Sequence, residues 1–143
     1  CVTKPFICGT ILQKCAGCKI IPANFQSEIT DKETVLVLLL DAQCRLIKPV
    51  EISTGTLNES IAHPRDILRP AIIHNAYGFI LAHNHPSGNP APSQADDTLT
   101  GRIRESAKLL GVRFLDHIII GKPTATVQRN YYSYNSYGMK KPV

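Results

Sequence analysis

The sequence predicts an α/β (α+β) domain in which a mixed central β-sheet is flanked by two main helices. Apolar runs of strand length occur at residues 33–41, 77–82 and 112–120, each followed by polar or turn-forming residues. Two longer segments, starting near His63 and at Ser93, repeat apolar residues at helical spacing. Strands that first pair through a turn and then alternate with helices favour a three-layer or sandwiched arrangement around a mixed sheet.

The composition is that of one ordinary globular domain. The chain has 143 residues, of which 43% are hydrophobic and 19% charged. Sixteen Lys and Arg residues against eleven Asp and Glu residues give a net charge of +5. The basic residues are scattered over several elements, so this charge favours solubility over a nucleic-acid surface. No apolar stretch is long enough to span a membrane, and we expect a cytoplasmic protein.

Residues 1–30 mix Pro, Gly, Cys and polar residues, and we expect a variable N-terminal extension there. The chain starts at Cys1 without Met and without a signal-peptide pattern, which favours a fragment of a longer protein. Cys15 and Cys18 have the spacing of a zinc knuckle or a redox pair. No second pair of this spacing completes a structural zinc site, although Cys1 and Cys8 could supply ligands. Reduced thiols are the favoured interpretation.

The first elements are two strands. Residues 33–41 form a continuous run of Leu and β-branched residues, which predicts a central strand buried on both faces. A short turn at residues 42–44 leads to residues 45–52, which alternate well enough for the second strand of a hairpin. Residues 55–60 are rich in turn formers and predict a connection.

The first helix is predicted to start at His63-Pro64, because proline fits the first turn of a helix. Its apolar residues recur at helical spacing and give one apolar face. Pro70 lies inside this pattern and should kink the helix or reset its start. His63 and His74 are interpreted as a cap-side and a surface histidine, since neither has a partner at ligand spacing.

The second helix is predicted from Ser93 to Leu110, with Gly111 as its C-terminal stop. Residues 112–120 form another strand. Residues 125–127 and 131–134 are expected to close the sheet as an edge hairpin.

The chemistry is predicted to lie between these elements. His83 and His85 follow the buried strand at residues 77–82, and residues two apart on a strand point to the same face. Asp96 stands three residues after Ser93 and could approach them if the intervening loop folds back. Two imidazoles and one carboxylate, with a fourth position left open, are typical of a hydrolytic Zn²⁺ site.

Asp96 has a second interpretation. Ser93-x-x-Asp96 is close to a capping box, in which Ser93 caps the helix and the carboxylate is favoured by the positive end of the helix dipole. The two interpretations are compatible. The combination of two histidines at strand spacing with a correctly spaced Ser and Asp predicts a metal site.

The spacing of these residues resembles a known signature. His83-x-His85, seven residues, Ser93, two residues and Asp96 are similar to the motif of the JAB/MPN metalloenzyme (JAMM) families. Other stretches resemble the C-terminal domain of RadC-like proteins, from about Glu33 to Gly121 and more loosely from Tyr131 to Met139. These stretches are Gly55-Thr56-Leu57-Asn58, His63-Pro64-Arg65-Asp66, Asn75-Ala76, Leu81 to Gly88 and Asp116 to Gly121.

The resemblance implies a single MPN/JAB-type domain with cytidine-deaminase-like layering. That domain would occupy residues 31–135, after the extension at 1–30 and before a C-terminal tail at 136–143. It also implies that Glu33, at the start of a strand, is the general base, with Glu28 and Glu51 as rivals.

The implied activity is zinc-dependent hydrolysis of an amide bond in a peptide or isopeptide. Zn²⁺ would be held by His83, His85 and Asp96, and Ser93 would donate a hydrogen bond to the oxyanion. A DNA-associated role without peptidase activity is the main alternative, because RadC-like proteins carry a DNA-repair label. A non-catalytic scaffold is the third. His117 is either an outer partner of the metal or a buried, hydrogen-bonded histidine.

Overall fold

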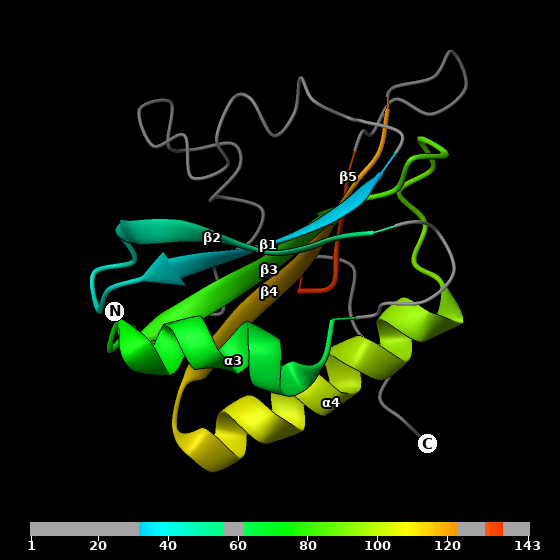
Figure 1. The fold of residues 1–143 in the computed structure, drawn as a ribbon. Helices are drawn as coiled ribbons and strands as arrows, with labels where there is room; N and C mark the ends of the chain where they lie inside the picture. Colours follow the sequence, from blue (N-terminus) through cyan, green and yellow to red (C-terminus); the bar gives the residue numbers. More distant parts are fainter. Residues whose placement is uncertain (1–31, 56–61, 123–130, 136–143) are drawn as a thin grey trace.

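The computed structural model of the protein describes residues 32–55, 62–122 and 131–135. The helices and strands predicted between residues 33 and 120 are confirmed, and their order places strands before and after each helix (Figure 1). The elements are β1 (Glu33–Leu40), β2 (Leu46–Gly55), α3 (Pro64–Ile73), β3 (Gly78–Asn84), α4 (Gln94–Leu110), β4 (Arg113–Ile120) and β5 (Tyr131–Ser133).

The five strands form one mixed sheet in the order β2-β1-β3-β4-β5. β1 pairs antiparallel with β2 and with β3, β3 pairs parallel with β4, and β4 pairs antiparallel with β5. The parallel pair is connected through α4, as a parallel pair requires a crossover. The predicted mixed sheet with two main helices is therefore what the chain forms.

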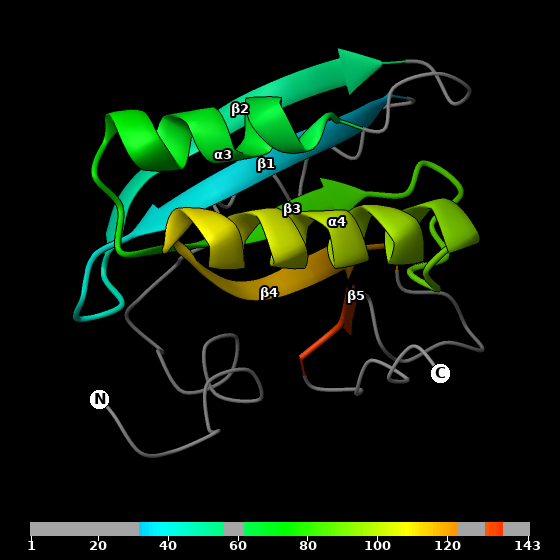
Figure 2. The same cartoon turned by 90° about the horizontal axis from the view of Figure 1, so that it is seen from below.

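Both helices lie on the same face of the sheet (Figure 2). They pack against the inward side chains of β1 and β3 in one core cluster, which includes Val35, Val37, Leu39, Ile67, Leu68, Phe79, Leu81, Leu99 and Ile103. The alternate side chains of the same strands, such as Leu38 and Ile80, form a second cluster on the opposite face. The described residues thus build two layers, and no third layer occurs among them. Helical periodicity shows that a helix has an apolar face but not which sheet face it covers.

The antiparallel pairing of β1 with β3 brings the start of β1 beside the end of β3. Val35 is the register partner of His83. Glu33 precedes Val35 by two residues, so its side chain points to the same face of the sheet. The first residue of β1 and the last residues of β3 therefore lie side by side at one end of the two strands.

β2 and α3 differ from expectation. β2 continues to Gly55, three residues beyond the predicted end, and β1 pairs with it along this extension. α3 runs without interruption from Pro64 to Ile73, so Pro70 does not restart it. Proline removes one backbone donor, and in a helix of ten residues tertiary packing of Ile67 and Ala71 against the sheet offsets that loss.

Several expectations fall outside the described residues. These are the N-terminal extension with its four cysteines, most of the turn-rich connection, the strand at 125–127 and the tail at 136–143. The other half of the expected edge hairpin forms β5, which pairs with the end of β4. In the described parts of the chain, we find no helix with the length and hydropathy needed to cross a membrane.

Candidate metal centre

Three side chains converge at the end of β3. His83 is the sixth residue of that strand, His85 follows it directly, and Asp96 lies in the first turn of α4. The Nε2 atoms of His83 and His85 are 3.0 Å apart. His83 Nε2 is 3.2 Å from Asp96 Oδ1, and His85 Nε2 is 3.3 Å from Asp96 Oδ2. The sequence-predicted ligand residues are therefore brought together.

These distances fit a metal ion. Two ligands that are each about 2.0–2.1 Å from a tetrahedral Zn²⁺ lie roughly 3.3 Å apart, close to the separations observed here. Among the described residues, His83, His85 and Asp96 are the one group of His, Cys, Asp and Glu side chains whose ligand atoms could hold a metal ion. Two imidazole nitrogens and one carboxylate oxygen leave a tetrahedral ion one position for substrate or water.

The loop between β3 and α4 orients His85. The backbone N–H of His85 donates to the Ile120 carbonyl at 2.9 Å, which fixes the loop to the end of β4. Its ring Nδ1 lies 2.9 Å from the carbonyl oxygen of Asn89. A carbonyl only accepts, so Nδ1 carries the proton and the neutral ring presents Nε2 as an electron-pair donor.

The start of α4 orients Asp96. The backbone N–H and the hydroxyl of Ser93 donate to Asp96 Oδ2 at 2.8 and 2.7 Å. The backbone N–H of Asp96 donates to Ser93 Oγ at 3.2 Å, which completes a capping box. Asp96 thus caps the helix and is also part of the cluster. The capping interpretation is confirmed, and it is compatible with the ligand interpretation.

The charges of the cluster are coupled. Burial by itself would raise the pKa of Asp96, but hydrogen bonds with His83, His85 and Ser93 outweigh it and hold the pKa well below 3.8. The hydrogen bond with Asp96 raises the pKa of His85 above 6.5, against the opposing effect of burial. The carboxylate is therefore ionised across the physiological range and attracts a cation, whether a metal ion or a proton on His85.

Glu33 lies at the rim of the cluster. Its Oε1 is 3.9 Å from His83 Nε2, and its side chain is 36% exposed, so solvent reaches it. Asn84 holds this part of β1: its Oδ1 accepts from the Thr34 N–H at 2.7 Å, and its Nδ2 donates to the Lys32 carbonyl at 3.1 Å. These bonds flank Glu33 on both sides. Sequence reasoning missed Asn84, although its place between two histidines puts its side chain on the other face of the strand.

The structure does not support either alternative general base, Glu51 or Glu28. Glu51 is the register partner of Leu36, while its neighbours Val50 and Ile52 pack on the helix side of the sheet. Its side chain therefore points to the face opposite His83. Glu28 lies outside the described residues.

His117 on β4 lies behind His83. Its Nε2 is 2.8 Å from His83 Nδ1, and its Nδ1 is 2.6 Å from Thr100 Oγ1. It is fully buried, and burial followed by the nearby His83 lowers its pKa well below 6.5. The alternative of a buried, hydrogen-bonded histidine is confirmed, and its contact with a candidate ligand is compatible with the other alternative, an outer partner of the metal. Thr100 was missed, and its only sequence signal is its position one helical turn after Asp96.

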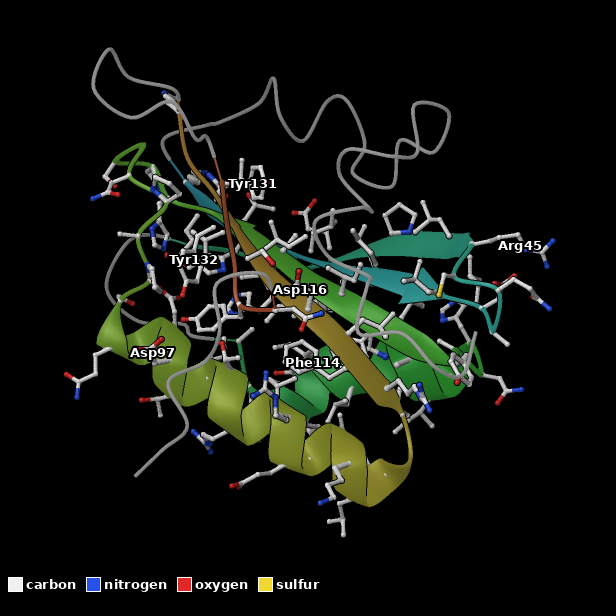
Figure 3. All side chains as sticks on the ribbon, turned by 180° about the vertical axis from the view of Figure 1, so that it is seen from behind. Arg45, Asp97, Phe114, Asp116, Tyr131 and Tyr132 are labelled. Carbon is white, nitrogen blue, oxygen red and sulfur yellow. The ribbon has the colours of Figure 1, made fainter. Side chains whose placement is uncertain are left out.

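The end of β5 and the two residues after it pack against His117 and Asp116. The ring of Tyr134 stacks on the His117 ring with centroids 5.0 Å apart, and its hydroxyl donates to Asp97 at 2.7 Å. Asp116 accepts from the Ser133 hydroxyl at 2.7 Å and from the Asn135 N–H at 3.0 Å. Figure 3 shows Asp116 beside β5 and Asp97 on the first turn of α4.

Comparison with known proteins now bears on this site. The model of the RadC-like JAB domain matches residues 17–139. The chain belongs to the RadC-like JAB domain family. The predicted resemblance is thereby confirmed, and a His-His-Asp cluster at this position is compatible with metal binding of the JAMM type.

Individual relatives of this RadC-like JAB domain are also close in sequence. A UPF0758 protein of Geotalea uraniireducens is 50% identical over 100 residues, covering 68% of this chain and 44% of the relative. A UPF0758 protein of Haemophilus ducreyi is 49% identical over 100 residues, covering 68% and 45%. The chain therefore spans less than half the length of these relatives, and their shared name states no activity.

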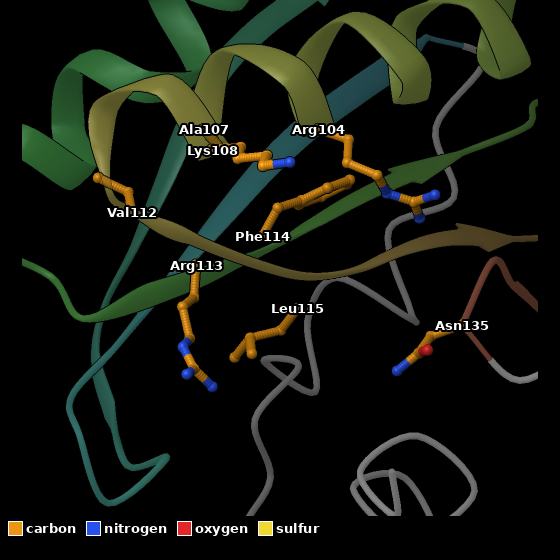
Figure 4. A pocket seen from close by; sticks show the side chains of 8 residues that line it. All are labelled: Arg104, Ala107, Lys108, Val112, Arg113, Phe114, Leu115 and Asn135. Carbon is orange, nitrogen blue, oxygen red and sulfur yellow. The ribbon is translucent and has the colours of Figure 1, made fainter. Parts of the chain in front are cut away.

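A separate pocket of about 400 Å³ lies between the C-terminal half of α4 and the start of β4 (Figure 4). Arg104, Lys108 and Arg113 line it together with apolar side chains such as Phe114. None of the candidate metal ligands lines this pocket. It is a cationic surface feature of the RadC-like JAB domain, distinct from the histidine cluster.

Proposed function

We propose that this RadC-like JAB domain is a zinc-dependent hydrolase of the JAMM type that cleaves an amide bond. The mutual spacing of three candidate ligand side chains carries the proposal: 3.0 Å between the histidine Nε2 atoms, 3.2 Å from His83 Nε2 to Asp96 Oδ1, and 3.3 Å from His85 Nε2 to Asp96 Oδ2. Zn²⁺ held by His83, His85 and Asp96 would lower the pKa of a bound water towards about 7.

Glu33 is proposed as the general base. It lies on the same sheet face as His83, its Oε1 is 3.9 Å from His83 Nε2, and solvent reaches it. A carboxylate in this place can take a proton from the attacking water at Oε1 and pass it to the leaving amine. The bonds of Asn84 to Lys32 and Thr34 hold the backbone on both sides of Glu33 while this proton moves.

Ser93 is proposed to stabilise the oxyanion. Its hydroxyl is at the exposed start of α4 and donates to Asp96 Oδ2 in the structure. Rotation about its side-chain bond would turn the same proton toward a substrate carbonyl oxygen, while the Ser93 N–H would keep its bond to Asp96. The role therefore needs a second rotamer when substrate binds.

The substrate class is proposed to be a peptide or an isopeptide, hydrolysed in the cytoplasm. A general base, an oxyanion donor and an activated water are the groups that amide hydrolysis needs. Loops define which amide fits, and a scaffold of this type supports many substrates.

The test is zinc-dependent cleavage of a quenched fluorescent peptide library and of matched lysine-linked isopeptides. We expect cleavage that a chelator abolishes and added Zn²⁺ restores. Glu33→Gln should keep its zinc and lose roughly 10²–10⁴-fold in rate. Ser93→Ala should keep zinc and lose on the order of 10²–10³-fold, with about 1 kcal/mol of cap stability.

The matched control is Glu51→Gln, which makes the same chemical change on the opposite face of the sheet. It should leave zinc content and rate unchanged. A wild-type protein that binds no zinc, or equal rates for Glu33→Gln and Glu51→Gln, would contradict the assignment.

A DNA-associated role is the second candidate, and the cationic pocket favours it. Arg104, Lys108 and Arg113 could contact phosphates there, and such contacts weaken as salt rises. Titration of labelled duplex DNA at several salt concentrations tests it. Binding that weakens with salt and is lost in Arg104→Ala with Arg113→Ala, at unchanged zinc content, would support this role. Binding unaffected by these changes would refute it.

A further inference from the structure

A line of three hydrogen bonds connects two of the candidate ligands through the interior. His83 Nδ1 meets His117 Nε2 at 2.8 Å, and His117 Nδ1 meets Thr100 Oγ1 at 2.6 Å. The Thr100 hydroxyl is in turn 2.6 Å from the backbone carbonyl oxygen of Asp96. The three linked side chains are 2%, 0% and 0% exposed, so water does not compete for these bonds.

The last acceptor sets the direction of the whole line. A carbonyl oxygen only accepts, so the Thr100 hydroxyl donates its single proton to Asp96. Thr100 Oγ1 can then only accept from His117, which places the His117 proton on Nδ1. Neither ring nitrogen of His117 faces a carboxylate, and a buried imidazolium without one is costly, so the ring is neutral. Its Nε2 therefore accepts from the Nδ1–H of His83.

The consequence reaches the metal centre. The neutral form of His83, which is the form that binds a metal, then carries its proton on Nδ1 and has a free electron pair on Nε2, the atom that is 3.2 Å from Asp96 Oδ1. His85 obtains the same tautomer from the Asn89 carbonyl. For His83 the buried pair of His117 and Thr100 replaces that carbonyl.

The His117 ring is held in the orientation that the line requires. Tyr134 stacks on it with an interplanar angle of 7°, and the Tyr134 N–H donates to the His117 carbonyl at 3.0 Å. Turning the ring over would break the bonds at both nitrogens. The ring is thus held by contacts from β3, α4 and the segment after β5.

We propose that His117 and Thr100 are positioning residues that fix His83 in its metal-binding tautomer and tie that tautomer to the backbone of Asp96. This inference rests on the proposed metal centre, but neither residue would touch the ion or the substrate. Outer partners of metal-binding histidines commonly act in this way.

Thr100→Val tests the line with little change in volume. Valine offers no acceptor to His117 Nδ1, so the His117 proton should move to Nε2. His83 Nδ1 must then accept, and its own proton moves to Nε2, where it blocks the metal. We expect zinc affinity, measured by competition with a chromophoric chelator, to fall about 10- to 100-fold. Thr100→Ser keeps the hydroxyl and should restore wild-type affinity.

Thr98→Val is the matched control. Thr98 lies on the same helix, and its hydroxyl donates to the Gln94 carbonyl at 2.9 Å. Like the Thr100 bond, this bond goes to the carbonyl four residues earlier, but the Thr98 side chain is exposed. Its loss should leave zinc affinity unchanged. A general weakening of α4 would affect both threonine variants, whereas the proposed tautomer effect is confined to Thr100→Val.

The decisive readout needs no metal. Imidazole ¹⁵N shifts in the zinc-free protein report the tautomer of His83, and we expect Nδ1–H in the wild type and Nε2–H in Thr100→Val. Unchanged affinity and tautomer in Thr100→Val would overturn the inference while leaving the proposed function intact. A wild-type protein that binds no zinc would overturn the proposed function. The tautomer comparison would still test whether the line of hydrogen bonds sets the His83 tautomer.

A second pair covers the case in which Thr100→Val fails to fold. Glutamine at position 117 offers a carbonyl oxygen to His83 and an amide to Thr100, whereas leucine offers neither. His117→Gln should keep the His83 tautomer and most of the zinc affinity, and His117→Leu should lose both. Equal results for the two variants would contradict the proposal.

Discussion

His83 has a partner for each ring nitrogen, and this is what makes it the central residue of the cluster. Its Nδ1 meets His117 inside the protein, and its Nε2 meets His85 and Asp96 at the open side. A ring held at both ends cannot turn away when the metal leaves. The candidate centre is therefore organised in advance of metal binding.

Removal of His83 should cost most of the metal affinity. His83→Ala leaves two protein ligands, so we expect its zinc affinity to fall by more than the roughly 10- to 100-fold typical of an outer partner. His74→Ala is the control, because His74 is exposed and only caps the end of α3. Metal analysis after dialysis measures both. Equal zinc content in the two variants would refute the ligand assignment.

Metal binding should depend on pH through His85. Asp96 raises the pKa of His85, so in the metal-free protein a proton competes with the ion for Nε2. Apparent zinc affinity should fall about tenfold for each pH unit below that raised pKa, because one proton must be released.

The proton on His85 that weakens metal binding should stabilise the fold of the metal-free protein. A group whose pKa is raised on folding stabilises the fold fully below its unfolded value of about 6.5, and this contribution is lost as pH rises through the raised pKa. Asp96, whose pKa is lowered, contributes above about 3.8 and loses its contribution in acid. Thermal unfolding of metal-free protein and of His85→Gln across this range measures it, and identical pH profiles would contradict the account.

Among single residues, the sequence could predict which side chains form the cluster but not which residues hydrogen-bond to them from behind. His83, His85 and Asp96 follow from strand period and local spacing. His117 reaches His83 only because β3 and β4 pair in a parallel register that sets Leu81 opposite His117. That register joins residues more than thirty positions apart, and no local pattern encodes it.

Among the elements, the loop between β3 and α4 determines how the ligands meet. It is fixed to the end of β4 by the bonds from His85 to Ile120 and from the Lys122 N–H to the Gly88 carbonyl, at 2.9 and 2.8 Å. Gly88 has a φ of +82°, a conformation that favours glycine. The loop thus depends on β4 for the placement of Asn89, the acceptor of the His85 ring proton.

Gly121→Ala should disturb this loop. A Cβ at Gly121 would overlap the Gly88 carbonyl oxygen and would lie 2.8 Å from the Pro90 Cδ atom, so the loop must move. We expect zinc affinity to fall about 10- to 100-fold as Asn89 shifts, and stability to fall by about 1–3 kcal/mol.

Gly101→Ala provides the control within α4. A Cβ there meets no atom within 4 Å, and alanine is favoured over glycine in a helix, so this variant should gain about 0.5–1 kcal/mol and keep its zinc affinity. Chelator competition and thermal unfolding measure both variants. Wild-type affinity in Gly121→Ala would show that the loop does not orient His85.

Element types were predictable and element placement was not. The start of α4 at Ser93 and its end at Gly111 follow from a capping box and a left-handed glycine with a φ of +71°. The side of the sheet on which α3 and α4 pack does not follow, because β3 is buried on both faces. Alternation gives no sign of orientation in such a strand.

For the whole molecule, the described sheet carries two cores of different kinds. One is closed by α3 and α4, and the other lies on the opposite face around Leu38, Ile80 and Ile118. The candidate metal ligands lie beside the helix-covered core. The chain spans less than half the length of its UPF0758 relatives, so the activity of a full-length protein stays a proposal.

The cysteines outside the described residues should not contribute to the metal site. Cys15 and Cys18 lie in the segment before β1, and thiolates bind zinc well, so a second site would add about one equivalent. We expect about one equivalent of zinc in the wild type and in Cys15→Ser with Cys18→Ser. Two equivalents that fall to one in the double variant would show a second, structural site.

The central claim is that His83, His85 and Asp96 hold one divalent metal. Anomalous diffraction from crystals of the zinc-loaded protein, recorded above and below the zinc absorption edge, tests it most directly. We predict one peak about 2.0–2.2 Å from both histidine Nε2 atoms and from one Asp96 oxygen. No peak at this position, or a peak elsewhere with these side chains turned away, would contradict the account.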